Sequence, residues 1–166
     1  NLLRLGHWLA HGRMPVAGVI TGATNEAVDY FVRREHVDVC IRGYTNKNEA
    51  WQAFLDAFPA TPEEVAFVYD DVLDLSMARH CGLRICVRRD GPAFNEFVSS
   101  KGFCDYRTGK PGGQGAVREV CELFLSLTGM FEHAVQTRID YGTVYRDYLN
   151  ARTAIDTHSV VRSPAH

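Results

Sequence analysis

Three places in the sequence carry residue types suited to phosphoryl chemistry, and each follows a predicted β-strand. Thr21 ends one strand, Lys47 begins the helix after the next, and Asp70 and Asp71 follow a third strand, with Asp74 one helical turn further on. A hydroxyl and an ammonium group can hold phosphate oxygens and stabilise the charge that develops in phosphoryl transfer. Adjacent carboxylates stay ionised most easily beside a cation, and oxygen ligands with a phosphate suit Mg²⁺.

Each of these residues alone has an ordinary structural explanation. A threonine at a strand end is common, and a lysine near a helix start is usually solvated. Asp71 can act as a helix cap, and its negative charge interacts favourably with the helix dipole. It is the order of a hydroxyl, a lysine and an Asp-Asp-x-x-Asp segment on three successive strand ends that points to a site.

The predicted strands and helices that must position these residues indicate an α/β fold. Short β-branched runs alternate with helical patterns, which is typical of a parallel sheet, and parallel sheets bind ligands beyond the carboxyl ends of their strands. Residues 61–64 give a helix-start signal, and a Gly-rich loop precedes the last strongly amphipathic helix. We expect helices over 2–11, 26–34, 73–80, 116–127 and 132–150, strands over 15–21, 37–41, 65–69 and 83–87, and disorder over 159–166.

Composition limits the classes of partner. The chain has 166 residues, of which 46% are hydrophobic, and a net charge of −2, so no general field attracts nucleic acid or an anionic membrane. No apolar run or leader pattern predicts a membrane span or secretion. The five cysteines are odd in number and lack Cys-x-x-Cys spacing. We interpret them as reduced thiols of a cytoplasmic protein, and not as a disulfide frame or a zinc site.

The segments around Thr21, Lys47 and Asp70, in this order along the chain, resemble motifs two to four of the haloacid-dehalogenase-like superfamily. Within that superfamily the chain resembles the capless 3-deoxy-D-manno-octulosonate 8-phosphate phosphatases. The resemblance covers roughly residues 2–129, which we expect to form the phosphatase core. It is most specific at residues 112–120, Gly-Gly-Gln-Gly-Ala-Val-Arg-Glu-Val. We expect residues 130–166 to form a C-terminal helical extension and tail. The other matching segments are residues 19–22, 43–50 and 63–75.

The resemblance implies a capless, three-layer Rossmann-like fold with a mainly parallel sheet, and a Mg²⁺-dependent phosphatase that uses an aspartyl-phosphate intermediate. It implies that Asp70 binds Mg²⁺, that Asp71 and Asp74 order its water shell, and that Thr21 and Lys47 bind the phosphoryl group. Gly22, Gly112, Gly113 and Arg118 would lie near the substrate, a small sugar phosphate. It also implies a homotetramer.

The sequence departs from the family pattern in three ways. It contains no Asp-x-Asp-Gly motif, so we expect the central first strand, with its nucleophile, to lie upstream of Asn1 in the natural protein. Tyr69 replaces a glycine, which predicts added bulk beside the metal. The run Thr21-Gly22-Ala23 replaces Ser-Gly-Arg.

Two alternative functions therefore stay open, hydrolysis of a sialic-acid-type 9-phosphate and a catalytically inactive scaffold. A two-component receiver domain is disfavoured, because its acidic pair comes first in the chain. A dinucleotide-binding fold is disfavoured because no Gly-x-Gly-x-x-Gly segment opens a helix.

Overall fold

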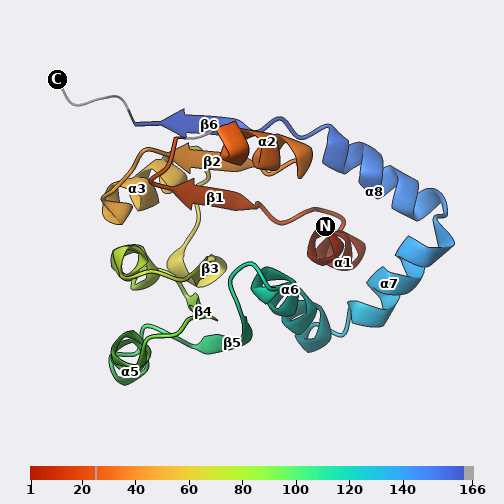
Figure 1. Cartoon of the computed structure of the whole chain (residues 1–166). Coiled ribbons are helices and arrows are strands. Elements are labelled where there is room, and N and C mark those ends of the chain that lie inside the picture. The colour runs from red at the N-terminus through yellow and green to blue at the C-terminus, as the bar shows by residue number, and fades with distance from the viewer. Residues whose placement is uncertain (25, 163–166) are drawn as a thin grey trace. The chain divides into compact units, whose positions relative to one another are not determined.

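The computed structural model describes residues 1–24 and 26–162. The chain forms two compact units, the first made of Asn1–Tyr44 with Cys121–His166 and the second of Thr45–Val120. Each unit contains a three-stranded parallel sheet, in the order β1-β2-β6 in the first unit and β3-β4-β5 in the second (Figure 1). These parallel sheets with their connecting helices confirm the predicted α/β class.

The first sheet has β2 (Val39–Arg42) at its centre, between β1 (Gly18–Thr21) and β6 (His158–Val161). Because β2 is paired on both sides, its residues 39–41 are fully buried, whereas β1 is an edge strand and only partly buried. Helix α2 (Glu26–Arg34) packs on this sheet through Val32, which contacts a cluster that includes Cys40. The bounds of α2 agree with the sequence prediction.

A helical cluster completes the first unit. It joins α1 (Leu2–His11), the end of α6 (Ala116–Leu127), α7 (Phe131–Asp140) and α8 (Thr143–Thr153). The bounds of α1 and α6 agree with the prediction, but the single helix expected over 132–150 is wrong. The chain turns at Tyr141, which adopts a left-handed conformation with φ of 50°, and restarts after Gly142.

In the second unit β4 (Leu83–Arg88) lies between β3 (Ala66–Tyr69) and β5 (Tyr106–Pro111). The unit also contains α3 (Lys47–Ala57), α4 (Leu75–Ala78) and α5 (Pro92–Ser100). A core cluster forms where Leu75 and Ala78 of α4 and Val98 of α5 meet Tyr69 and Cys86 of the two strands. Strand β3 is the edge strand of this sheet, and the acidic pair follows it directly.

The structure differs from the expected elements at several further points. Residues 62–64 form only a single 3-10 turn, and the helix expected over 73–80 is a 3-10 turn followed by the short α4. Helix α5 and strands β5 and β6 were not expected. Ser159–Val161, expected to be disordered, pair with β2, and residues 163–166 lie outside the described chain.

None of the helices within the described ranges has both the length and the hydropathy that a membrane span requires. All five cysteines are free thiols, and Cys40, Cys81 and Cys86 are buried.

Candidate active site

The acidic segment after β3 puts its three aspartates to different uses. Asp71 caps the following turn, because its Oδ1 accepts a hydrogen bond from the Leu73 amide at 3.4 Å. Asp70 is exposed, and within the described residues its carboxylate has no hydrogen-bond or ion-pair partner; only its backbone oxygen accepts a hydrogen bond, from Arg89. Asp70 is therefore the acid most available to a cation.

Asp74 is held in an ion pair with Lys47. The distance from Lys47 Nζ to Asp74 Oδ1 is 3.4 Å, and the two side chains are only 9% and 15% exposed. Lys47 is placed by the start of α3, where Asn46 caps the helix by accepting from the Asn48 amide. Burial raises the pKa of Asp74, Lys47 opposes that shift, and the neighbouring charge of Asp70 adds to it. The second unit thus brings together Lys47, Asp70 and Asp74.

Thr21 and Gly22 belong to the first unit. Thr21 ends β1, and its Oγ1 accepts a hydrogen bond from the Ala23 amide at 3.1 Å, which closes a tight turn after the strand. A side chain at Gly22 would approach the Tyr44 carbonyl oxygen to 3.8 Å, an ordinary contact. Thr21 thus stands at the carboxyl end of its strand, where the sequence analysis expected it.

The Gly-rich loop joins β5 to α6. Gly113 and Gly115 have φ of 74° and 97°, a backbone region that disfavours other residues. Gly112 does not have a positive φ, so its backbone conformation does not require glycine. Arg118 is exposed on the first turn of α6. The sequence analysis missed Glu119, whose carboxylate accepts hydrogen bonds from Tyr106 Oη and from the amides of Gly109 and Lys110. Glu119 ties the loop to the helix.

Tyr69 does not add bulk at the strand tip, so that expectation is corrected. Its side chain is only 3% exposed and packs in the core with Leu75 and Val98. Its hydroxyl donates a hydrogen bond to the Phe103 carbonyl oxygen at 2.7 Å, and burial raises its pKa well above the usual range. Alternation along β3 turns Tyr69 into the core, and the acidic pair follows beyond the strand.

The acidic residues fit a partial Mg²⁺ site. In residues 1–24 and 26–162, no three His, Cys, Asp or Glu side chains gather into a complete ligand set for a metal ion. Mg²⁺ commonly binds through one or two carboxylates, with waters and a substrate phosphate filling the other positions. An exposed, unpaired Asp70 with Asp74 beside it meets that smaller requirement.

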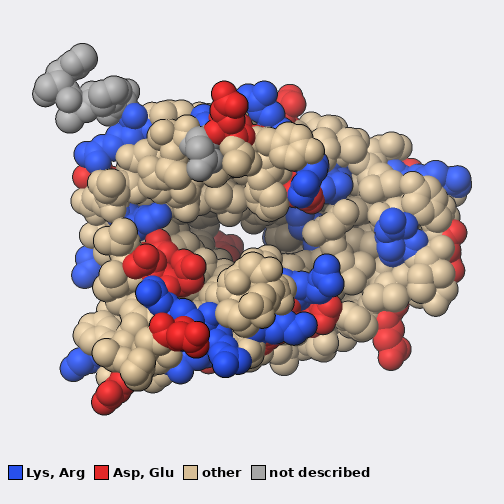
Figure 2. Space-filling model, viewed as in Figure 1, with Lys and Arg blue, Asp and Glu red and all other residues tan. Residues whose placement is uncertain are grey.

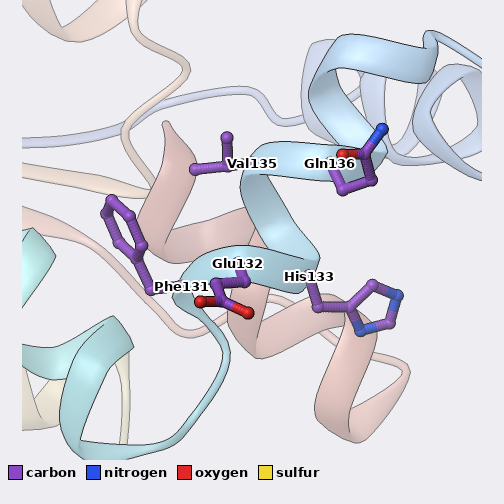
Figure 3. Close-up of a pocket in the computed structure, with 5 residues that line it drawn as sticks. All are labelled: Phe131, Glu132, His133, Val135 and Gln136. Atoms are coloured by element: carbon purple, nitrogen blue, oxygen red, sulfur yellow. The ribbon is translucent and has the colours of Figure 1, made fainter.

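A pocket of about 560 Å³ lies elsewhere, along α7. Figure 3 shows Phe131 and Val135 on one side of this helix and His133 and Gln136 on the other. None of the predicted site residues lines the pocket, and a surface lined by one helix offers no convergent polar groups. We assign it no role.

The sequence matches no protein-family model. A curated relative, the 3-deoxy-D-manno-octulosonate 8-phosphate phosphatase of Escherichia coli K12, is 32% identical over 116 residues, which cover 70% of this chain and 58% of the relative. The Yersinia pestis phosphatase of the same name is 29% identical over 116 residues, 70% of this chain and 59% of the relative. The chain thus spans about three fifths of the length of these relatives.

Solved structures of the same phosphatase and of the same superfamily also match this chain. The Moraxella catarrhalis 3-deoxy-D-manno-octulosonate 8-phosphate phosphatase, in complex with magnesium, phosphate and the sugar acid, matches with a TM-score of 0.66 and 29% identity, over 82% of this chain and 74% of that chain. A hydrolase of the haloacid-dehalogenase-like superfamily from Legionella pneumophila matches with a TM-score of 0.67 and 29% identity, over 84% of this chain and 72% of that chain.

Proposed function

We propose that this chain belongs to the haloacid-dehalogenase-like superfamily, and within it to the 3-deoxy-D-manno-octulosonate 8-phosphate phosphatase family, and that it forms the phosphoryl-binding and metal-binding part of such a phosphatase. The observation that carries the proposal is the buried Lys47–Asp74 ion pair beside the unpaired Asp70 carboxylate. A domain without chemistry to perform gains nothing from collecting acids and a buried lysine at a strand tip. The relatives with this name supply the substrate class.

The residues of the chain have distinct tasks in this proposal. Lys47 binds a phosphoryl oxygen through its ammonium group, and Asp74 holds Lys47 in place. Thr21 donates its hydroxyl hydrogen bond to another phosphoryl oxygen. Gly22, Gly112, Gly113 and Arg118 border the substrate.

Asp70 would hold Mg²⁺, with Asp71 and Asp74 ordering the waters around it. When bound, Mg²⁺ neutralises charge on the phosphoryl oxygens. The Moraxella structure, which contains magnesium and phosphate, supports this cofactor. The nucleophilic aspartate of an aspartyl-phosphate route is not offered by any Asp-x-Asp-Gly motif in these 166 residues, so the proposal requires it from elsewhere in the natural protein.

The preferred substrate is 3-deoxy-D-manno-octulosonate 8-phosphate. A sialic-acid-type 9-phosphate is the second candidate, because Thr21-Gly22-Ala23 offers no basic side chain to select between sugar acids. A catalytically inactive scaffold is the third, and it is favoured by the use of Asp71 as a cap and by the lack of an Asp-x-Asp-Gly motif in these 166 residues. We also place the protein in the cytoplasm as a homotetramer, on the basis of its free thiols and its family.

The test is phosphate release from 3-deoxy-D-manno-octulosonate 8-phosphate, with and without Mg²⁺. It should compare the natural protein from its own start codon with the 166-residue chain. Magnesium-dependent turnover by the natural protein, together with loss of turnover in its Lys47→Met variant, would support the proposal. No turnover of this substrate or of a sialic-acid 9-phosphate would favour the scaffold.

A further inference from the structure

Strand β4 ends at Arg88, and Arg89 follows it directly; the proposed chemistry uses neither arginine. Both side chains are exposed, yet their positions are fixed. Arg89 donates from Nη1 to the Asp70 backbone oxygen at 2.9 Å, and its guanidinium lies 5.0 Å from the centre of the Phe94 ring. The Asn95 side chain donates to the Arg89 carbonyl oxygen at 3.1 Å. Arg89 is therefore held beside the acidic segment without occupying its carboxylates.

Arg88 is held on the other side of the strand. Its Nη1 donates to the Gly109 carbonyl oxygen at 3.0 Å, and its amide donates to Thr108 Oγ1 at 2.9 Å. Thr108 is only 2% exposed, and its hydroxyl donates onward to the Lys110 carbonyl oxygen at 2.7 Å. The Arg89 guanidinium is thus anchored to the residue that follows β3, and the Arg88 guanidinium is anchored to β5.

Acidic residues lie near this pair, among them Asp70 and the neighbouring Asp90, but their carboxylates do not engage the guanidinium groups. Neither Arg88 nor Arg89 forms an ion pair with an acid in the part of the chain that the structure describes. Figure 2 shows Lys and Arg atoms beside Asp and Glu atoms in the region of the second unit. The amino terminus of α5, which has no side-chain cap, follows at Pro92 and adds partial positive charge. An anionic group would be stabilised here.

We propose that Arg88 and Arg89 bind the carboxylate of the sugar-acid substrate, an inference that rests on the proposed function. Guanidinium groups bind carboxylates through paired, charge-assisted hydrogen bonds. Neighbouring strands lie about 4.8 Å apart, so the end of β4 is about 5 Å and the end of β5 about 10 Å from the end of β3. An eight-carbon acid has a maximal reach of roughly 8 Å from carboxylate to phosphorylated carbon, at about 1.2 Å per bond.

These lengths allow one substrate to place its phosphate at the acidic segment and its carboxylate at the arginines. The second motif, Thr21-Gly22-Ala23, offers no basic side chain for that carboxylate. The arginine pair therefore supplies a basic recognition element that the second motif lacks.

Equilibrium titrations separate this inference from the proposed function. The 166-residue chain and the natural protein are each titrated with 3-deoxy-D-manno-octulosonate, which has the carboxylate but no phosphate, and separately with inorganic phosphate and with Mg²⁺. Arg88→Gln and Arg89→Gln should each weaken binding of the sugar acid about tenfold, since each removes a hydrogen bond between charged groups. Affinity for phosphate and for Mg²⁺ should stay within about twofold of wild type. Arg88→Lys and Arg89→Lys should give intermediate losses, because they keep the charge and lose the paired geometry.

Lys101→Gln is the matched control, because Lys101 is an exposed cation at the opposite end of α5. Unchanged sugar-acid affinity in the Arg88→Gln/Arg89→Gln double variant, or no sugar-acid binding by wild type, would overturn the inference. Weaker phosphate binding with unchanged sugar-acid binding would also overturn it, as would tighter Mg²⁺ binding alone, which would make the arginines counter-charges. Absence of phosphate and Mg²⁺ binding in both wild-type proteins would instead reject the proposed function. Unfolding curves of each variant exclude a general loss of structure.

Discussion

At the scale of single residues, the buried Lys47–Asp74 pair has the largest energetic consequence. Both side chains are mostly removed from water, so removing either one would leave the charge of the other without its ion-pair partner. Burial raises the pKa of Asp74 in spite of the lysine, which shows that the pair only partly offsets the cost of desolvation. The same arrangement that costs stability leaves an ammonium group ready for an anionic ligand.

Removing one partner of this pair should therefore destabilise the second unit. Lys47→Met leaves a buried, unpaired Asp74 and should lower the free energy of unfolding by about 1–3 kcal/mol. The Lys47→Met/Asp74→Asn double variant should lose less than the sum of the single losses, because neither charge is then left alone. Urea unfolding of wild type, Lys47→Met, Asp74→Asn and the double variant measures both effects. Lys101→Met, at an exposed lysine, serves as the control, and an equal loss there would contradict the argument.

At the scale of secondary-structure elements, Arg84 fixes the start of β4 to the turn before β5. Its Nη2 donates to Asp105 Oδ1 at 2.7 Å, and its Nε and backbone amide both donate to Oδ2 at 2.8 Å. A fourth hydrogen bond runs from Nη1 to the Gly102 carbonyl oxygen. The hydrogen bonds from the Arg84 side chain are the main cause of the lowered pKa of Asp105.

This lowered pKa predicts a pH dependence of stability. The pKa of Asp105 is below its ordinary value of 3.8 in the folded state, so its contribution is present above pH 3.8 and is lost as the pH falls through the folded pKa. Asp105→Asn should cost about 1 kcal/mol at pH 7, since the pair is partly exposed, and nothing at the lowest pH. Urea unfolding from pH 7 to pH 2 measures the difference. Glu96→Gln, an exposed carboxylate of α5, should leave the profile unchanged.

Glu119 has a comparable role at the junction of β5 and α6. It accepts from the Gly109 amide at 2.7 Å and from the Lys110 amide at 2.9 Å, and the Gly109 hydrogen bond is the main cause of its lowered pKa. Glu119→Ala should speed hydrogen exchange of these two amides about tenfold or more, because the turn loses its acceptor. Glu119→Gln should have a smaller effect, since one oxygen remains. Glu122→Ala, exposed on the same helix, should leave both amides protected.

At the scale of the whole molecule, the last third of the sequence builds the same unit as the first 44 residues. Tyr148 of α8 is fully buried, and its hydroxyl donates to the backbone and side-chain oxygens of Asn1 at 3.0 and 2.9 Å. Arg152 contacts Glu35, and β6 pairs with β2. The C-terminal helices are therefore part of the hydrophobic core of this unit.

Truncating Tyr148 tests that role. Tyr148→Ala should lower the free energy of unfolding by about 3–5 kcal/mol, the usual cost of removing a buried aromatic ring. Tyr141→Ala is the matched control, because Tyr141 is 50% exposed, although its ring contacts Arg138 and Tyr145. Thermal and urea unfolding compare the two variants. Similar, small losses in both would show that α8 is not needed by the core.

Some elements could be predicted because their signals are local. The helix over Leu2–His11 ends where Gly12 takes a left-handed conformation with φ of 69°, and apolar residues recur at helical spacing before it. The order of Thr21, Lys47 and the acidic segment on successive strand ends is also a property of the sequence. The family resemblance could therefore be recognised from the sequence, and the relatives confirmed it.

Other elements depend on partners far away in the sequence. Residues 106–111 contain lysine, glycine and proline and do not read as a strand, but β4 and Glu119 supply hydrogen bonds that hold them extended. Residues 158–161 become a strand only because the edge of β2 accepts them. Helix α5 was not predicted for a similar reason, because its buried residue Val98 packs against Tyr69 and Cys86 of the sheet.

The sequence by itself determined the α/β class, the resemblance to a phosphatase family, and the positions of Thr21 and the acidic segment at the ends of their strands, because strand periodicity, helix caps and motif order depend on neighbouring residues. The tertiary structure decided how those residues are used. It turned Tyr69 into the core, made Asp71 a cap, paired Asp74 with Lys47, and placed Arg89 against the Asp70 backbone. Apart from the local Asp71 cap, these contacts join residues distant in sequence, and their geometry exists only once the strands have paired and the core has excluded water.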